Sequence, residues 1–294
     1  NMHRDFFMAG MPGSGKTTYL ASLWTLLSEG CVSTMYKKEV GVMPEDCATL
    51  NQIAQEILSY KDIERTKIGE KVKLSIPLKD ENGADVFLRI PDLAGEVFRN
   101  LVEDRQLPKE TVSRLREADC ILFFTYYKNM SYEKRIVDGS YDTVNREYTN
   151  DENKDKQTSA GLDNQINKKR DANESEVVEL LLSLLELLKK SKKSVNIRFI
   201  MSAWDMVEKE YGNEILPEEF AKKKFPLLYQ CIYSNRDRMN FEFWGVSAIG
   251  GNLADRDDIK RIQSEESKAI KVVAPSGERS NDLIVLLTEM GDDK

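Results

Sequence analysis

Gly10-Met11-Pro12-Gly13-Ser14-Gly15-Lys16-Thr17 is the stretch of sequence that decides the fold of this chain. It matches the pattern G-x-x-x-x-G-K-[ST] at every defined position. It lies between an apolar run at residues 6–9 and a helical pattern at residues 17–28. A strand before the pattern and a helix after it are the context in which it forms a phosphate-binding loop. The sequence therefore predicts a site for a nucleoside triphosphate at the end of the first strand.

The residue types of this loop suit the chemistry of a bound phosphate chain. Glycines allow backbone N–H groups to turn toward an anion, and the start of the following helix adds a partial positive charge. We expect Lys16 to reach the β- and γ-phosphates and to act in catalysis, and the Thr17 hydroxyl to bind Mg²⁺. The residues predicted to bind the nucleotide here are Gly10, Gly13, Ser14, Gly15, Lys16, Thr17 and Thr18.

The composition of the chain limits the other classes of function. Charged residues make up 32% of the sequence and the net charge is −7, which argues against a broad surface for nucleic acid. His3 is the only histidine and the four cysteines are far apart, so no zinc site is predicted. No apolar run reaches the roughly 18 residues that suggest a membrane span, and no signal peptide is evident. We expect a cytoplasmic protein without a transmembrane segment.

Apolar runs alternate with helical patterns along most of the chain. Residues 71–77 and 86–90 flank a polar turn at residues 80–83 and predict a β-hairpin. The alternation predicts an α/β fold of the P-loop NTPase type, with a mostly parallel sheet, one antiparallel edge strand and helices on both faces. Further strands are expected at 120–126, 195–201 and 241–246, and helices at 44–60, 97–117, 174–193, 217–235 and 282–290.

Two segments depart from this alternation. Residues 128–173 are rich in polar side chains and hold few aliphatic ones, so they cannot bury enough apolar surface to offset the entropy of ordering. Residues 252–280 are also polar. We expect a single domain over residues 1–294, with a flexible insertion at 128–173 and a smaller polar insertion at 252–280.

A second box follows the predicted hairpin. Residues 88–96 read LRIPDLAGE and resemble the D-x-x-G box of small GTPases, in the place where Ras-like proteins carry it. The resemblance implies that Asp92 holds Mg²⁺ through water and that the Gly95 N–H meets the γ-phosphate. A threonine should also cover Mg²⁺, and we choose Thr66 because it lies shortly before the hairpin. The other candidates are Thr34 and Thr49.

Glu96 occupies the position at which Ras-like proteins place a glutamine that orients the attacking water. A carboxylate beside the γ-phosphate adds repulsion, although it can also accept a proton from water. We assign Glu96 to catalysis together with Gly95. We expect slow intrinsic hydrolysis, which an arginine from a partner protein would accelerate.

Two later boxes concern the base of the nucleotide. Residues 202–205 read SAWD and occupy the place of the N-K-x-D box of GTPases, in which only Asp205 matches. Its carboxylate, expected at an exposed strand end, can accept hydrogen bonds from guanine N1 and N2. Trp204 is a candidate to cover the base in place of the missing lysine. Ser247 and Ala248 resemble the last box, S-A-x, in which a backbone N–H contacts guanine O6, and this favours GTP over ATP.

Taken in order from Gly10 to Gly250, these boxes resemble a Ras-like GTPase of the translation-factor-related class. Within that superfamily, SAWD at 202–205, FPLL at 225–228 and WGVSA at 244–248 are similar to bacterial double-GTPase proteins encoded with partner proteins in conflict systems. The resemblance implies a Mg²⁺-dependent GTPase switch that binds GTP and GDP and acts through a protein effector or activating partner.

Two other functions stay open at this point. Glu96 in place of glutamine favours a nucleotide-dependent scaffold with negligible turnover. The missing asparagine and lysine before Asp205 leave room for an ATP-binding ATPase or kinase.

Overall fold

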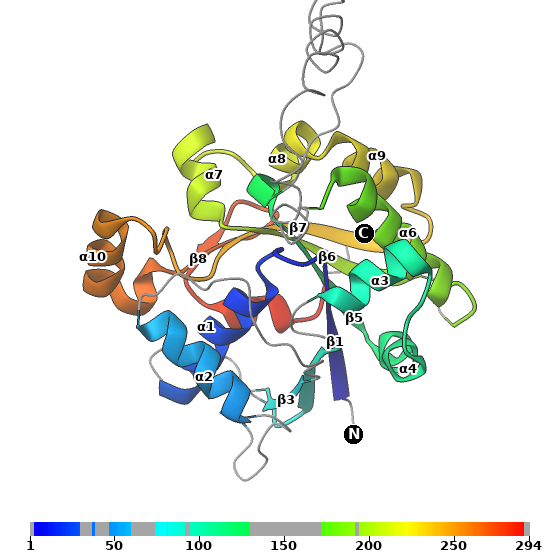
Figure 1. Cartoon of the computed structure of the whole chain (residues 1–294), viewed down its shortest axis with the longest axis horizontal. Helices are drawn as coiled ribbons and strands as arrows, with labels where there is room; N and C mark the ends of the chain where they lie inside the picture. The colour runs from blue at the N-terminus through cyan, green and yellow to red at the C-terminus, as the bar shows by residue number, and fades with distance from the viewer. Residues whose placement is uncertain are drawn as a thin grey trace, which may run out of the picture.

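The computed structural model of the chain describes residues 3–29, 37–38, 47–59, 74–80, 82–91, 95–129, 172–191 and 194–290. Its strands form one nine-stranded sheet in the order β2-β3-β4-β1-β5-β6-β7-β8-β9. The five central strands from β4 to β7 pair in parallel, and the strands beyond them on both sides pair antiparallel (Figure 1). The strand bounds are β1 (His3–Ala9), β2 (Lys37–Lys38), β3 (Leu74–Lys79), β4 (Asp85–Ile90), β5 (Cys120–Thr125), β6 (Val195–Ser202), β7 (Met239–Ser247), β8 (Lys271–Val273) and β9 (Arg279–Ser280).

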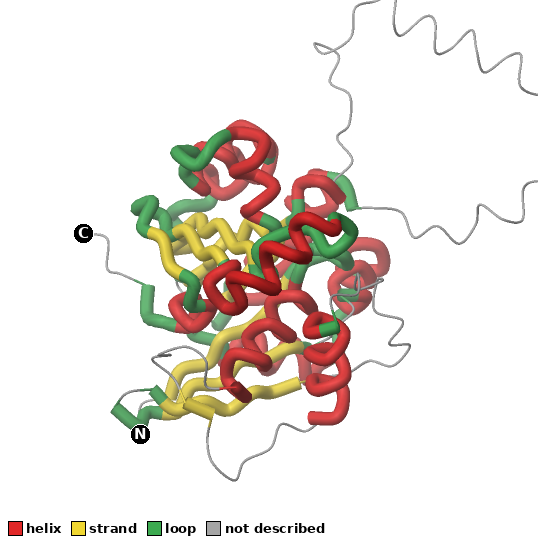
Figure 2. The backbone as a smooth tube through the Cα atoms, turned by 90° about the vertical axis from the view of Figure 1, so that its left-hand side faces the viewer, coloured by secondary structure: helices red, strands yellow, loops and turns green. Residues whose placement is uncertain are grey.

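Helices cover both faces of this sheet, as expected (Figures 1 and 2). The alternation of side chains along β1 shows why both faces are buried: Phe6 and Met8 enter one core, whereas Phe7 and Ala9 enter the other. The first core includes α1 (Lys16–Glu29), α2 (Cys47–Leu58) and the 3₁₀ helix η4 (Leu283–Leu287). The second includes α3 (Glu96–Asp104), α4 (Lys109–Glu117), α6 (Glu174–Leu188), α7 (Trp204–Tyr211), α8 (Pro217–Lys224) and α9 (Pro226–Ser234). The predicted α/β architecture is confirmed.

The hairpin of β3 and β4 forms where the sequence predicted it. Leu74 pairs with Ile90 and Lys79 with Asp85, and Asp80 begins a turn that closes at Ala84. β4 then pairs with β1 in parallel, so the hairpin places its second strand beside the strand that leads into the phosphate-binding loop.

Several helices differ from their predicted extents for local reasons. The helix expected at 97–117 is divided, because Arg105 takes a left-handed conformation and α4 begins only after Pro108. The helix expected at 217–235 is divided at Pro226, which has no N–H to continue α8. The helix expected at 282–290 is instead the short η4.

The carboxyl-terminal part of the described chain is fastened to the sheet by a buried arginine. Arg198 on β6 donates to the carbonyl oxygens of Leu286, Thr288 and Glu289 at 2.7, 2.9 and 3.1 Å, and it pairs with Glu242 at 2.8 Å. These carbonyls satisfy the guanidinium, so an arginine is tolerated in the interior of the protein.

The polar segment 252–280 contributes to the sheet. It contains α10 (Arg256–Glu265), the 3₁₀ helix η3 (Glu266–Ala269) and strands β8 and β9, and β8 extends the sheet beyond β7. Of the segment 128–173, the structure describes only its ends. The 3₁₀ helix η1 (Tyr127–Asn129) overlaps its start, and at its end Asn173 opens α6 with a capping box to Glu176. In the described part of the chain, no helix combines the length and apolarity that crossing a bilayer requires.

Candidate functional site

The phosphate-binding loop packs against the ends of β5 and β6. It leaves β1 after Ala9 and enters α1 at Lys16. A Cβ on Gly10 would approach the Phe124 carbonyl oxygen to 2.7 Å, and a Cβ on Gly15 would approach Ser202 Oγ to 2.5 Å. Both positions require glycine because the neighbouring strands leave no room for a side chain.

Lys16 directs its amine back across this loop. The residue is 3% exposed, and its Nζ donates to the carbonyl oxygens of Gly10 and Met11 at 2.7 and 2.9 Å and to Ser14 Oγ at 3.2 Å. The aromatic ring of Phe98 lies 5.9 Å from the same nitrogen. The loop thus holds one cationic group at a fixed place, where the phosphates of a nucleotide are expected.

The glycine of the second box lies against the loop. Gly95 precedes α3 with a φ of 79°, and a Cβ there would lie 2.9 Å from Lys16 Nζ and 3.0 Å from the Pro12 nitrogen. Glu96, the first residue of α3, follows directly. The start of α3 therefore lies next to the phosphate loop, which is the neighbourhood that the predicted roles of Gly95 and Glu96 require.

The predicted magnesium ligands are only partly described. Thr17 is half-buried in the first turn of α1, and Thr18 follows it. Asp92 and Thr66 lie outside the described residues. Hydroxyl and carboxylate oxygens are the donors that Mg²⁺ prefers, so the proposed set suits this ion. The assignments of Asp92 and Thr66 remain predictions.

The two base boxes meet through their side chains. Ser247 Oγ, at the end of β7, donates to Asp205 Oδ1 at 2.5 Å and accepts from the Gly250 N–H at 3.1 Å. Asp205 is 4% exposed, so the expectation of an exposed strand end was wrong: α7 and the loop after β7 enclose it. Its second oxygen, Oδ2, is buried and has no hydrogen-bond partner among the described residues. Such an atom is costly in a core, and this marks it as a candidate ligand-binding group.

Trp204 has no exposed surface with which it could cover a base. Its side chain is fully buried, packs edge-on against Phe220 and lies so close to Gly245 that a Cβ there would approach the indole to 2.2 Å. The suggestion that Trp204 covers the base is therefore wrong, because neighbouring residues already cover both the ring and its edges. Trp204 is a core residue beneath the site.

A sequence profile of the family described as Double-GTPase 1 matches residues 7–290. The chain belongs to this family. No curated protein matches it significantly.

The solved structures that the chain resembles share little sequence identity with it. The GTPase-like domain of S. cerevisiae Ski7 bound to GTP is 14% identical with a TM-score of 0.41, over 87% of this chain and 45% of that one. A bacterial selenocysteine-specific elongation factor, EF-Sec, is 11% identical with a TM-score of 0.36, over 90% and 29%. The G domain of the T. maritima FeoB iron transporter is 12% identical with a TM-score of 0.30, over 90% and 98%. The chain spans less than half the length of the first two.

The sequence did not predict one contact in this Double-GTPase 1 chain, which joins the phosphate loop to the box that contains Asp205. Ser202 Oγ donates to the Ser14 carbonyl oxygen at 2.7 Å and so ties the end of β6 to the phosphate loop. The next residue, Ala203, takes a left-handed conformation with φ at 55° before α7 begins. Strain of this kind is concentrated at functional sites. The available signal was the position of Ser202, first in the box that also contains Asp205.

Proposed function

We propose that this Double-GTPase 1 protein binds GTP and GDP with Mg²⁺ and acts as a GTPase switch with slow intrinsic turnover. The observation that carries the proposal is the contact between Ser247 and Asp205, which leaves Asp205 Oδ2 as a buried acceptor. Ser202 connects this base-binding side to the phosphate loop. Ligands of open α/β sheets bind at the carboxyl ends of the parallel strands, and Ser202, Asp205 and Ser247 all lie at or shortly after such ends.

The donor and acceptor pattern of the base favours guanine. Guanine presents N–H donors at N1 and N2, which a carboxylate can accept together, whereas adenine presents an acceptor at N1. Ser247 fixes the carboxylate through Oδ1, and Oδ2 remains available to accept. Ala248, the next residue, would contact O6 through its backbone N–H, as the resemblance implies. GTP should therefore bind in preference to ATP.

The phosphate side supports triphosphate chemistry through residues of the loop and of α3. Lys16 would exchange its contacts with the loop for the β- and γ-phosphates, and the Gly95 N–H would meet the γ-phosphate. A bound Mg²⁺ would neutralise charge on the same phosphates, held by Thr17 with Asp92 and Thr66. Glu96 replaces the glutamine that orients water, which supports slow hydrolysis and a role for an activating protein partner. The conflict-system association implied by the sequence resemblance would provide such a partner.

A scaffold with negligible turnover is the second candidate, and Glu96 is the feature that favours it. A single-turnover measurement of phosphate release separates the two functions. Release within minutes, with or without an added partner, would support the switch, and no release on either condition would support the scaffold.

Competition of GTP, ATP and XTP on wild type and Asp205→Asn tests the base assignment. A bidentate carboxylate contact is worth roughly 1–3 kcal/mol, so wild type should prefer GTP over ATP by about 5- to 150-fold. Asparagine retains one acceptor for Ser247 but brings a donor that opposes the guanine donors. The variant should lose most of the preference and should gain affinity for XTP. If wild type binds ATP as tightly as GTP and Asp205→Asn changes neither affinity, the GTP assignment fails and an ATP-binding function replaces it.

A further inference from the structure

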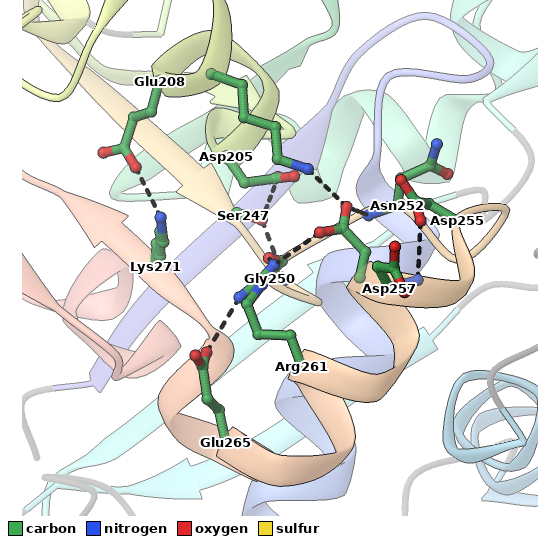
Figure 3. A network of polar contacts seen from close by, with 12 residues as sticks. Asp205, Glu208, Ser247, Gly250, Asn252, Asp255, Asp257, Arg261, Glu265 and Lys271 are labelled. Atoms are coloured by element: carbon green, nitrogen blue, oxygen red, sulfur yellow. Dashed lines mark hydrogen bonds and ion pairs between the residues drawn. The ribbon is translucent and has the colours of Figure 1, made fainter.

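A closed ring of polar contacts surrounds the loop that follows β7 (Figure 3). From Asp205 it passes to Ser247 and to the Gly250 N–H, as described above. The Gly250 carbonyl oxygen then accepts from Arg261 Nη2 of α10 at 2.5 Å. One side of the ring therefore runs from α7, through the loop, to α10.

Asp258 closes the other side of the ring. Its Oδ1 lies 3.3 Å from Arg261 Nη2, and its Oδ2 accepts from Lys209 Nζ at 2.7 Å. Lys209 is one helical turn beyond Asp205 on α7, so the contacts return to the helix from which they started. We refer to Asp205, Ser247, Gly250, Arg261, Asp258 and Lys209 as the polar ring.

Asp258 has a contact with the loop in addition to those in the polar ring. Besides Lys209 and Arg261, it accepts from the Asn252 N–H at 2.9 Å, so it holds the far end of the loop as well. Burial opposes its charged form, but the Asn252 N–H and the two cationic side chains outweigh this effect and lower the pKa of Asp258 to about 2. The carboxylate is thus an anion at every physiological pH.

The loop inside the polar ring leaves no room for a side chain at either of its two glycines. A Cβ on Gly251 would lie 2.8 Å from Arg261 Nη2 and 3.0 Å from Asp258 Cγ. A Cβ on Gly250 would lie 2.1 Å from the Ala269 carbonyl oxygen. The loop backbone therefore packs directly against α10 and the segment after it, and α10 determines the position of the loop.

We propose that Asp258 and Arg261 are positioning residues for recognition of the base, an inference that rests on the proposed GTP-binding function. They hold the loop so that Ser247 orients Asp205 and the Ala248 N–H faces the base. Neither residue belongs to the phosphate loop or to α3. Their loss should therefore weaken discrimination between bases and leave the affinity for phosphates unchanged.

The test compares three probes, each with Mg²⁺, by calorimetry: GTP, ATP and inorganic tripolyphosphate. Asp258→Asn and Arg261→Gln should each reduce the GTP-to-ATP affinity ratio by about tenfold, which corresponds to about 1.4 kcal/mol. Tripolyphosphate affinity should stay within about twofold of wild type, well below that tenfold change. Arg261 is partly exposed on α10, so its variant remains informative if Asp258→Asn fails to fold. Asp257→Asn is the matched control, because this neighbouring carboxylate is 93% exposed and pairs with Lys260 on the same helix.

Each outcome distinguishes the two claims. A wild-type protein without base preference overturns the proposed function, and this inference with it. A wild-type preference that both ring variants retain overturns the inference alone. A parallel fall in affinity for all three probes identifies a general structural role and also overturns the inference.

Discussion

Gly95 lies against Lys16, because a Cβ at position 95 would come within 2.9 Å of the lysine Nζ. Gly95, which directly precedes α3, and Lys16 are far apart in the sequence, but they lie next to each other in the fold. A side chain at position 95 would therefore compete with the Lys16 amine for the same space.

The first prediction follows from this close approach of position 95 to Lys16. Gly95→Ala should weaken GTP binding by at least about tenfold, equivalent to about 1.4 kcal/mol, and should affect GDP less, because its methyl group would displace Lys16 from the γ-phosphate side. Gly83→Ala is the control: its φ of 78° matches the 79° of Gly95, but nothing lies within 4 Å of its Cβ position. Titration of both variants with GTP and GDP gives the comparison. Equal nucleotide affinities in the two variants would contradict the prediction.

The second prediction concerns the charge at the phosphate loop. Lys16→Ala should abolish detectable triphosphate binding, since no other described side chain supplies a cation within the loop. A fluorescent nucleotide measures the binding, and circular dichroism confirms the fold. Lys260→Ala, a change at an exposed lysine on α10, should bind as wild type does. Unchanged affinity in a folded Lys16→Ala protein would refute the phosphate-loop assignment.

The third prediction concerns the packing beneath the base site. Gly245→Ala should destabilise the protein by about 1–3 kcal/mol, because the new methyl group would overlap the Trp204 ring. Trp204→Phe creates space at the same point, so the double variant should be more stable than the sum of the two single changes predicts. Urea denaturation of the four proteins in the cycle measures the coupling. Strictly additive free energies would show that the two residues do not compete for this space.

The fourth prediction concerns the long polar segment. Replacing residues 130–171 by a short glycine-serine linker should leave nucleotide affinity and the melting temperature close to wild type. The composition of the segment gives little apolar surface to bury, and the buried residues at its borders, Tyr127 and Ala172, are retained. Thermal denaturation and nucleotide titration of the shortened protein provide the measurement. Unfolding of that protein would show that the segment contributes to the core.

The central architecture could be predicted because its signals are local. The phosphate-loop motif, the apolar runs and the turn at residues 80–83 each specify structure through neighbours in the sequence. The residue type of Pro226 also predicts the division of the helix, but the apolar pattern on either side favoured one continuous helix. The η4 segment was harder to predict from the sequence, because the carbonyl oxygens of Leu286 and Thr288 accept hydrogen bonds from Arg198 on a distant strand.

The proposed base site could be predicted only in part from the sequence. Asp205 and Ser247 could be found from their boxes, but the burial of Asp205 and its contact with Ser247 depend on the packing of α7 against the end of β7. Trp204 was misassigned because its residue type favours stacking on a base. In the structure its indole instead packs against Gly245 in the core, where a side chain at position 245 would leave it no room. Asp258 could not be identified at all, since only the packing of α10 brings it to Lys209.

The alternation of β1 between the two cores limits how this chain can change in length. Removing one residue from β1 would turn Phe7 and Ala9 toward the core of α1, and Phe6 and Met8 toward that of α6. It would also shift the phosphate loop by one step against both neighbouring strands, β4 and β5. Related sequences should therefore vary freely in length between η1 and α6, yet keep the spacing from His3 to Thr17 constant. A survey of gaps in aligned relatives would reveal this contrast without any experiment on the protein itself.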